Sequence, residues 1–437
     1  MAPSFVDVAG EDASSPRHRV LKALLTDGPL SRAQLARATA LAPSTVTAVV
    51  RSLTDERVLI ATGPADLADV RRSGPRGTAL ALSPSLLATV GVDFGFQHVR
   101  VLISDLHANV LTLEHTELPA RYDRQEGIES AARLVRKAIA SAGLAREAII
   151  GAAVALPGPV DTDQQQVVDS DIQPGWGGTS AGDFADAFAL PAFIENDANL
   201  AALGEHVWGA GRGQRTTITV KLHSGIGAGV IVNGQLVSGA HGGAGEIGHI
   251  TIDPRGPLCR CGKRGCLDTF AAIPAILDAM AAKHPDLQVA ELIEMLHRGD
   301  PGARRVVADA ANLVGHVVAS ACLLLAPDSV IVVGAMARAG DAVIDPLREA
   351  VHRQAIPGIG QLPDITRGLL GDRHTALGGA ALVLRENGWL PAAPSRTDPS
   401  TGHSVGPGVG RAPRREPRAE ARATPSRLAG GSKPTAG

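Results

Sequence analysis

Apolar residues at helical spacing predict two short helices near the start of the chain. Between Arg17 and Thr26 the apolar side chains share one face, and a turn rich in glycine and proline follows. Ser31 and Gln34 have the spacing of a capping box, in which each side chain satisfies a backbone N–H at a helix start. We therefore expect a second helix from Ser31, with Leu35 and Ala38 facing the core.

A third helix follows at Pro43, whose missing N–H has no partner to lose at a first helical position. Its apolar residues repeat with the period of one buried face: Val46, Val49, Val50 and Leu53. The outward face carries small, polar and basic side chains: Ser44, Thr45, Thr47 and Arg51. Side chains of these types can reach phosphates and base edges in the major groove of DNA.

Two strands complete this first part of the chain. Val58–Ile60 and Thr78–Leu82 are predicted to form a β-wing, joined by a loop with Arg71, Arg72 and Arg76. Residues 16–83 contain ten basic and five acidic residues, so this segment is basic. We interpret residues 16–83 as a winged helix-turn-helix that binds DNA. A helical packing or dimerisation module without DNA is the alternative, since such folds host several functions.

Residues 84–390 alternate apolar strands with helical segments, which predicts an α/β fold. The clearest strands are Val99–Ile103, Ile149–Ala155, Ile218–Leu222 and Ser329–Val333. Cys322 lies in the apolar run Val317–Leu325 and is expected in the core.

The two ends of the chain have a different composition. Residues 1–15 lack apolar periodicity and are expected to be a disordered leader. Residues 391–437 are rich in Pro, Gly, Ser, Thr and Arg, with eight basic and three acidic residues. We expect a disordered basic tail. It is either a solvated segment without a role or one that attracts phosphate weakly.

Overall composition narrows the class of protein. A chain of 437 residues with 44% hydrophobic and 20% charged residues is expected to form a globular protein of several domains. The net charge of −2 implies that any contact with DNA comes from a local basic patch. No start typical of a signal peptide and no apolar run near the roughly 18 residues of a membrane span are present, so we predict a cytoplasmic protein without membrane contact.

Three of the four cysteines lie within eight positions, which indicates metal binding in a reducing compartment. Cys259, Cys261 and Cys266 with His249 supply the four ligands of a closed tetrahedral zinc site. Because four protein ligands leave no open position for catalysis, we predict a structural Zn²⁺.

Several further motifs accompany these ligands: Leu156–Asp161, Pro174–Trp176, Glu195–Asn199, Ser224–Gly229 and Glu246–His249. Over about residues 16–390 the chain resembles the ROK family of bacterial repressors, open reading frames and sugar kinases. With its winged helix it is similar to the branch that contains the xylose and N-acetylglucosamine repressors. The resemblance implies an actin-like fold, in which two α/β lobes close over a cleft.

The resemblance also implies which residues bind sugar hydroxyls: Asn196, Asp197, Glu246, His249 and Asp268. In the kinases of the family, the position of Asp197 is the general base that takes the proton of the attacking hydroxyl. Asp268 stands where the family usually has a longer glutamate, which leaves the preferred sugar open. On spacing alone, Asn196 and Asp197 also fit an ordinary turn whose side chains bond their own backbone.

The nucleotide motifs of the family are only partly present. Its kinases begin the domain with Asp-x-Gly-Gly-Thr, whereas this chain has Asp93 and Gly95 followed by Phe96, which hinders a close approach of phosphate to the backbone. His223 stands where a glycine is usual, and the segment around Gly334 has fewer glycines than the family pattern. The phosphate loop keeps Ser224, Gly225 and Gly227. We interpret these positions as a vestigial nucleotide site, so that ATP and Mg²⁺ matter only if kinase activity is retained.

Together these features predict a DNA-binding transcriptional regulator of carbohydrate genes, most simply a repressor. A sugar or sugar derivative in the cleft would control its binding to operator DNA, and it would act as a homodimer or tetramer. Two alternatives stay open: an ATP-dependent sugar kinase with an appended DNA-binding domain, and a zinc-stapled interaction protein without a sugar ligand.

Overall fold

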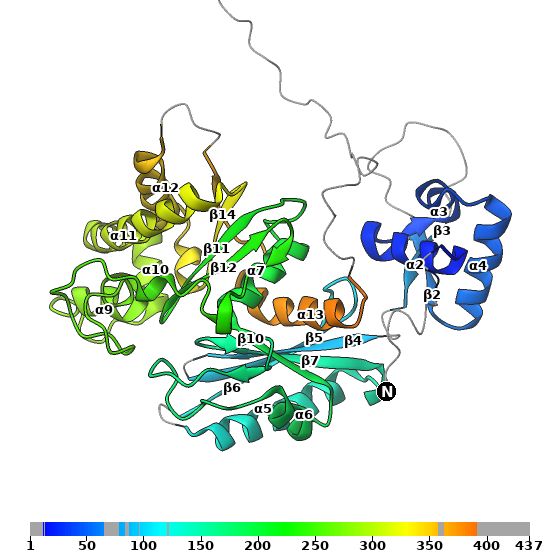
Figure 1. Ribbon diagram of the computed structural model, residues 1–437, viewed down its shortest axis with the longest axis horizontal. Coiled ribbons are helices and arrows are strands. Elements are labelled where there is room, and N and C mark those ends of the chain that lie inside the picture. Colours follow the sequence, from blue (N-terminus) through cyan, green and yellow to red (C-terminus); the bar gives the residue numbers. More distant parts are fainter. Residues whose placement is uncertain are drawn as a thin grey trace, which may run out of the picture. The chain divides into compact units, whose positions relative to one another are not determined.

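The structure is a computed structural model that describes residues 12, 14–64, 78–83, 87–95, 97–119, 122–356 and 362–390 (Figure 1). The predicted wing loop with Arg71, Arg72 and Arg76 lies outside the described residues, as do Phe96, the tail 391–437 and nearly all of the leader 1–15. The predictions for these segments therefore stay predictions.

Up to position 83, the residues that the structure describes form three helices and a small sheet. The helices are α2 (Pro16–Asp27), α3 (Arg32–Thr39) and α4 (Pro43–Asp55). The strands β1 (Leu30–Ser31), β2 (Leu59–Pro64) and β3 (Thr78–Leu82) pair in the order β1-β3-β2, all antiparallel. The predicted winged helix-turn-helix is thus confirmed in its three helices and both wing strands.

Local rules explain how these helices begin. The Ser31 N–H donates to the Gln34 side chain at 2.8 Å and the Gln34 N–H donates to Ser31 Oγ at 3.3 Å, so the capping box is present. Before α4, Ala42 is the N-cap residue, and no side chain caps the helix among the described residues. The predicted buried face of α4 is confirmed for Val46, Val50 and Leu53, which are fully buried, whereas Val49 is half-buried.

One core position in α3 was predicted wrongly. Ala38 is exposed and Thr39 is buried instead. The Thr39 hydroxyl donates to the carbonyl of Leu35, so a polar side chain can turn inward without losing a hydrogen bond. The backbone then reverses at Ala40, which has a left-handed conformation.

A mixed five-stranded sheet forms the first lobe of the larger part. Its strands are β4 (Ala88–Phe94), β5 (His98–Ser104), β6 (Val110–Glu117), β7 (Ile149–Leu156) and β10 (Ala192–Asn196), in the order β10-β7-β4-β5-β6. Strands β4, β7 and β10 are parallel, and β5 and β6 are antiparallel neighbours. Helices α5 (Arg124–Ala142) and α6 (Ala181–Phe188) cover one face, and the short strands β8 (Val160–Asp161) and β9 (Gln166–Val167) follow β7 (Figure 1).

The second lobe repeats this connectivity. Its strands are β11 (Thr217–Leu222), β12 (Ile226–Val232), β13 (Gln235–Leu236), β14 (Ser329–Val333) and β15 (Asp364–Arg367), in the order β13-β12-β11-β14-β15. Again the first three strands form an antiparallel meander and the last two are parallel to the first. Its helices are α8 (Asp268–Ala271), α9 (Ile273–Met280), α10 (Val289–His297), α11 (Pro301–Leu325) and α12 (Asp341–Gln354). The α/β class and the two-lobed arrangement are therefore confirmed.

Short 3-10 helices fill several connections: η1 (Arg146–Ala148), η2 (Ala240–Gly242), η3 (Ile247–His249), η4 (Ala335–Ala339) and η5 (Gly371–Arg373).

Two helices connect the lobes. Helix α7 (Asp197–Trp208) contacts strands β11 and β12, and helix α13 (His374–Glu386) contacts β4 and β7 (Figure 1). The two helices pack against each other where Gly204 and Gly378 remove any side chain between them. A Cβ atom at Gly378 would overlap the carbonyl oxygen of Leu200, so only glycine permits this approach.

Helix α11 has the length and apolarity of a membrane-spanning helix, and it is the one such helix in the described part of the chain. Its Val307, Val314 and Val318 are buried in the core of the second lobe. The expected core position of Cys322 is only partly correct, because Cys322 is half-buried and Leu324 beyond it is 85% exposed. The eight apolar residues of Val317–Leu325, interrupted only by Ser320, cover every face of a helix, so they cannot all face one core.

Replacing Gly378 by alanine tests the contact between the two connecting helices. We expect G378A to lower the free energy of unfolding by about 1–3 kcal/mol, because the added methyl group forces α7 and α13 apart. Urea unfolding of both proteins measures the change. The matched control is G182A in α6, where a Cβ meets only ordinary contacts and alanine favours the helix. Equal stabilities of G378A and the parent chain would contradict the tight packing.

Candidate functional site

A cavity of about 530 Å³ lies in the α/β part, and residues of both sheets line it. It contains all five side chains for which a sugar contact was expected: Asn196, Asp197, Glu246, His249 and Asp268. It also contains all six residues of the expected nucleotide site: Asp93, Gly95, Ser224, Gly225, Gly227 and Gly334. Motifs spread over 240 positions of the sequence thus meet in one place, although their roles stay predictions.

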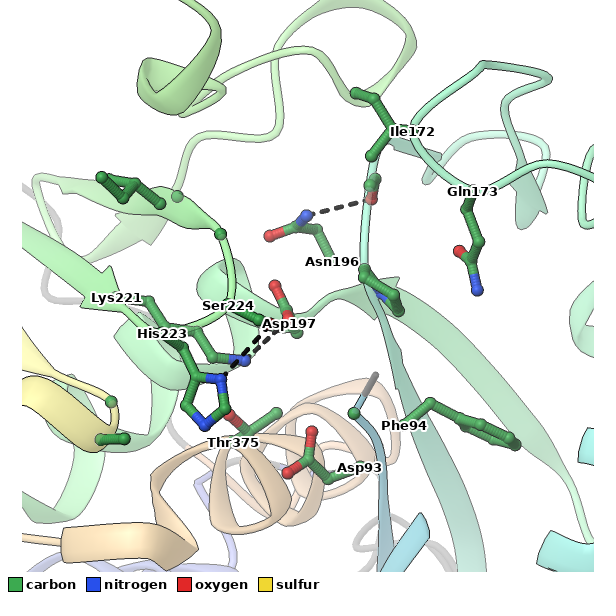
Figure 2. A pocket seen from close by; sticks show the side chains of 18 of the residues that line it. Asp93, Phe94, Ile172, Gln173, Asn196, Asp197, Lys221, His223, Ser224 and Thr375 are labelled. Carbon is green, nitrogen blue, oxygen red and sulfur yellow. Dashed lines mark hydrogen bonds and ion pairs between the residues drawn. The ribbon is translucent and has the colours of Figure 1, made fainter. Parts of the chain in front are cut away.

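Strand β10 and the start of α7 position two of these residues. The Asn196 side chain caps α7, since its Oδ1 accepts from the N–H groups of Ala198 and Asn199 at 2.8 and 3.1 Å. Its Nδ2 donates to the carbonyl of Gly158 at 3.0 Å (Figure 2). The turn-like bonding that spacing alone allowed is therefore present, while the residue still lines the cavity. Asp197 follows as the first residue of α7, where the positive end of the helix dipole favours a carboxylate.

Asp268 supports the cavity wall. Its Oδ1 accepts from the N–H of Ile226 at 2.8 Å, and its Oδ2 lies 3.7 Å from the guanidinium of Arg260. The side chain is 8% exposed. Asp268 therefore fixes the start of β12, next to the loop with Ser224 and Gly225, and this bond uses part of its capacity to accept from a ligand.

Glu246 and His249 lie at the two ends of one turn, η3. The Glu246 carboxylate is 3.9 Å from Nε2 of His249. Burial, with the negative charges of Asp197 and Asp268, raises the pKa of Glu246 to about 7. A carboxyl group of this kind can accept or donate a hydrogen bond near neutral pH.

The four expected metal ligands form one cluster. Their ligand atoms all lie within 4.8 Å of one another, with Cys259 Sγ 3.5 Å from His249 Nδ1 and Cys261 Sγ 3.6 Å from Cys266 Sγ. A tetrahedral zinc ion with Zn–S of about 2.3 Å and Zn–N of about 2.0 Å requires S···N and S···S edges of about 3.5 and 3.8 Å. Burial and the neighbouring sulfur atoms raise the pKa of the Cys266 thiol, which a bound cation would offset. The donor set therefore fits one tetrahedral metal ion.

The side chain of Lys221 is a cavity residue that the motif analysis missed. It comes from β11, and its ammonium group lies 2.7 Å from Oδ2 of Asp197 (Figure 2). The one charged residue in the strand Ile218–Leu222, which is otherwise apolar except for Thr219, was the available signal in the sequence.

Two histidines, His98 and His223, line the cavity near Lys221. The imidazole of His98 lies over Gly95, where a Cβ atom would overlap it. Burial and the nearby Lys221 charge lower the pKa of His223 to about 4, and burial lowers the pKa of His98 as well. Both imidazoles are therefore neutral at neutral pH.

Helix α4 carries the expected DNA-contacting residues. Ser44, Thr47 and Arg51 are exposed, whereas Thr45 is half-buried. The Thr47 hydroxyl donates to the carbonyl of Pro43 at 2.8 Å, so its oxygen stays available as an acceptor.

A winged helix-turn-helix joined to a two-lobed actin-like part with such a cavity defines a class of transcriptional regulators. Residues 89–386 match the ROK family model and residues 17–60 match the model of winged helix-turn-helix DNA-binding segments. The chain belongs to the ROK family and, with its winged helix, to the transcriptional regulators of that family.

Individual relatives agree with this assignment. The chain is 30% identical to the dual regulator NagC of Escherichia coli, over 82% of this chain and 89% of NagC. It is 27% identical to the xylose repressor of Bacillus spizizenii, over 84% and 94% of the two chains. The crystal structure of a ROK glucokinase from Streptomyces griseus, in complex with glucose and AMPPNP, is similar with a TM-score of 0.61. Its identity is 27%, over 68% of this chain and 98% of the kinase.

If the four clustered side chains bind a metal ion, binding should require the cysteine thiols of the cluster. Purified full-length protein should hold about one equivalent of metal, because the cluster offers four ligands for a single ion. The double variant C259S/C266S should lose it, as elemental analysis by mass spectrometry measures. The control C322S changes a thiol outside the cluster and should keep the metal. Retention of metal by C259S/C266S would contradict the assignment.

Proposed function

We propose that this protein is a repressor of carbohydrate genes whose binding to operator DNA is controlled by a sugar or sugar derivative in the cavity. The proposal rests on one observation. The same chain has exposed polar residues on α4 and a cavity lined by the five residues that were expected to contact a sugar. NagC and the xylose repressor, which the chain resembles over more than four fifths of its length, support the same assignment. A protein of this kind acts in the cytoplasm.

The cavity offers what a ring of hydroxyl groups requires. Glu246 and Asp197 supply acceptors, and His249 presents Nε2 on the side of Glu246 while its Nδ1 lies beside the thiol of Cys259. A zinc ion held through Nδ1 would fix the ring and leave the Nε2 proton for a sugar oxygen. We assign the ion to zinc in a structural role, because all four positions around it are protein ligands.

The turn after β4, where kinases of the family bind phosphate, fits a protein that binds sugar without efficient phosphoryl transfer. The imidazole of His98 occupies the space above Gly95, where close approach of a phosphate to the backbone would be required. The kinase alternative keeps one supporting observation, since Asp93 and Asp197 both line the cavity.

Ligand binding is coupled to DNA binding by a shift between two conformations. A ligand that contacts both lobes favours one arrangement of α7 and α13 over another, and it acts only through its difference in affinity for the two. In a homodimer or tetramer, this shift changes the distance between paired α4 helices, which must match successive major grooves of the operator.

The DNA assignment predicts the behaviour of α4 variants. T47A/R51A should bind a promoter fragment from its own operon roughly tenfold more weakly or worse in a gel shift, because it loses groove contacts. Its response to sugars in a thermal shift should be unchanged. The control R305A removes an exposed arginine on α11 that pairs with Asp309 and should retain the DNA. Equal retention by T47A/R51A and the parent chain would reject the DNA role of α4.

The ligand assignment predicts a response to one member of a panel of hexoses, hexosamines, pentoses and their derivatives. At 100 times its Kd, a specific ligand adds about 2.7 kcal/mol to stability and so raises Tm. E246Q should reduce this rise, and the exposed control E294Q on α10 should not. The same panel is run with ATP while ADP release is followed. Turnover that D197N abolishes would establish the kinase alternative, and no rise of Tm with any sugar would favour an interaction protein.

A further inference from the structure

Lys221 has an unusual position for a lysine. It lies in the central strand β11, between Gly227 of β12 and Val333 of β14, and its side chain is only 13% exposed. Its one direct ion pair in the described part of the chain is with Asp197 at 2.7 Å. A buried cation of this kind is costly unless anions surround it, so its surroundings indicate what it does.

The groups that face the ammonium come from several elements. Asp197, which directly follows β10, faces it from the start of α7, and Asp93 faces it from β4 (Figure 2). Both carboxylates thus lie at strands of the first lobe, whereas Lys221 comes from β11 of the second. Arg100 on β5 lies 4.0 Å from Asp93 and is partly exposed. The neighbouring histidines are His98, His223 and His374, and burial lowers the pKa of each of them.

Lys221 therefore stays charged in this place. Burial alone would lower the pKa of Lys221, but the charges of Asp197 and Asp93 outweigh burial and raise it. Because the three histidines are neutral at neutral pH, Lys221 is the cation that pairs with Asp197 and balances its charge among the residues that the structure describes.

Two carboxylates that face one cavity repel each other unless a cation lies between them. In phosphoryl transfer a magnesium ion normally supplies positive charge at such a place, and it also binds the phosphates of the nucleotide. The ammonium of Lys221 is fixed to the chain, carries one charge and cannot bridge phosphates in that way.

We propose that the ammonium group of Lys221 is an internal cation that replaces a divalent metal ion between Asp93 and Asp197, so that the cleft takes its ligand without metal or metal–nucleotide. Lys221 is thus a specificity-determining residue. It also occupies Oδ2 of Asp197, the carboxylate that a kinase would need free for a proton. That the ligand of the cleft carries several hydroxyl groups rests on the sugar-binding function proposed above; that it binds without a metal ion is what Lys221 adds.

Binding of Mn²⁺ alone to the full-length, zinc-loaded protein tests the proposal. Free Mn²⁺ is followed by electron paramagnetic resonance for the parent chain and for the variants D197N, K221M, K221R and K221M/D197N. We expect no D197N-sensitive Mn²⁺ site in the parent chain, a new site at least about tenfold tighter in K221M, and its loss in K221M/D197N. K221R keeps the positive charge and should behave as the parent chain does.

Two results would overturn the role of Lys221. One is a Mn²⁺ site in the parent chain that D197N removes, which decides the question even if K221M does not fold. The other is folded K221M, judged by circular dichroism, without a gain in Mn²⁺ binding. Sugar-dependent Tm shifts and DNA retention are separate readouts. A gain of Mn²⁺ binding in a chain that responds to no sugar would leave Lys221 as assigned and reject the proposed ligand.

Discussion

The contact between α7 and α13 at Gly204 and Gly378 determines where the rest of the cavity lies. Each helix rests on the sheet of a different lobe, so their close approach sets the distance between the two sheets. The first residue of α7 then lies at the cavity, with Asn196 as the cap that fixes the start of the helix. A methyl group at this contact would therefore alter a site that lies about two turns away along the helix.

Much of the fold was readable from local patterns. The capping box at Ser31 and the apolar stripe of α4 follow from residue spacing and were found where expected. Strand β14 was predicted with the bounds that it has. One error lies at Thr39, where a polar side chain can make its hydrogen bond to the helix backbone and still be buried. The other lies at Cys322, where an apolar run extends around the helix beyond the face that is buried.

The cavity was predictable only through motifs, because no periodicity reveals that residues such as Asp93 and Asp268 meet. Family motifs name positions but not hydrogen-bond partners. Asp268 thus proved to bond the backbone of Ile226, and Lys221 escaped notice because no motif contains it. Both outcomes depend on contacts between segments far apart in the sequence, which spacing cannot supply.

Ala42, the N-cap of α4, has one more consequence. With no side chain to bond them, the first amide groups of this helix keep their partial positive charge for an external acceptor. Ser44 and Thr47 are exposed near the same end. A serine or aspartate at position 42 would make the isolated helix more stable, and it would also neutralise the end of the helix that a backbone phosphate meets first. Stability of the free protein and attraction to an anion are thus opposed at this one position.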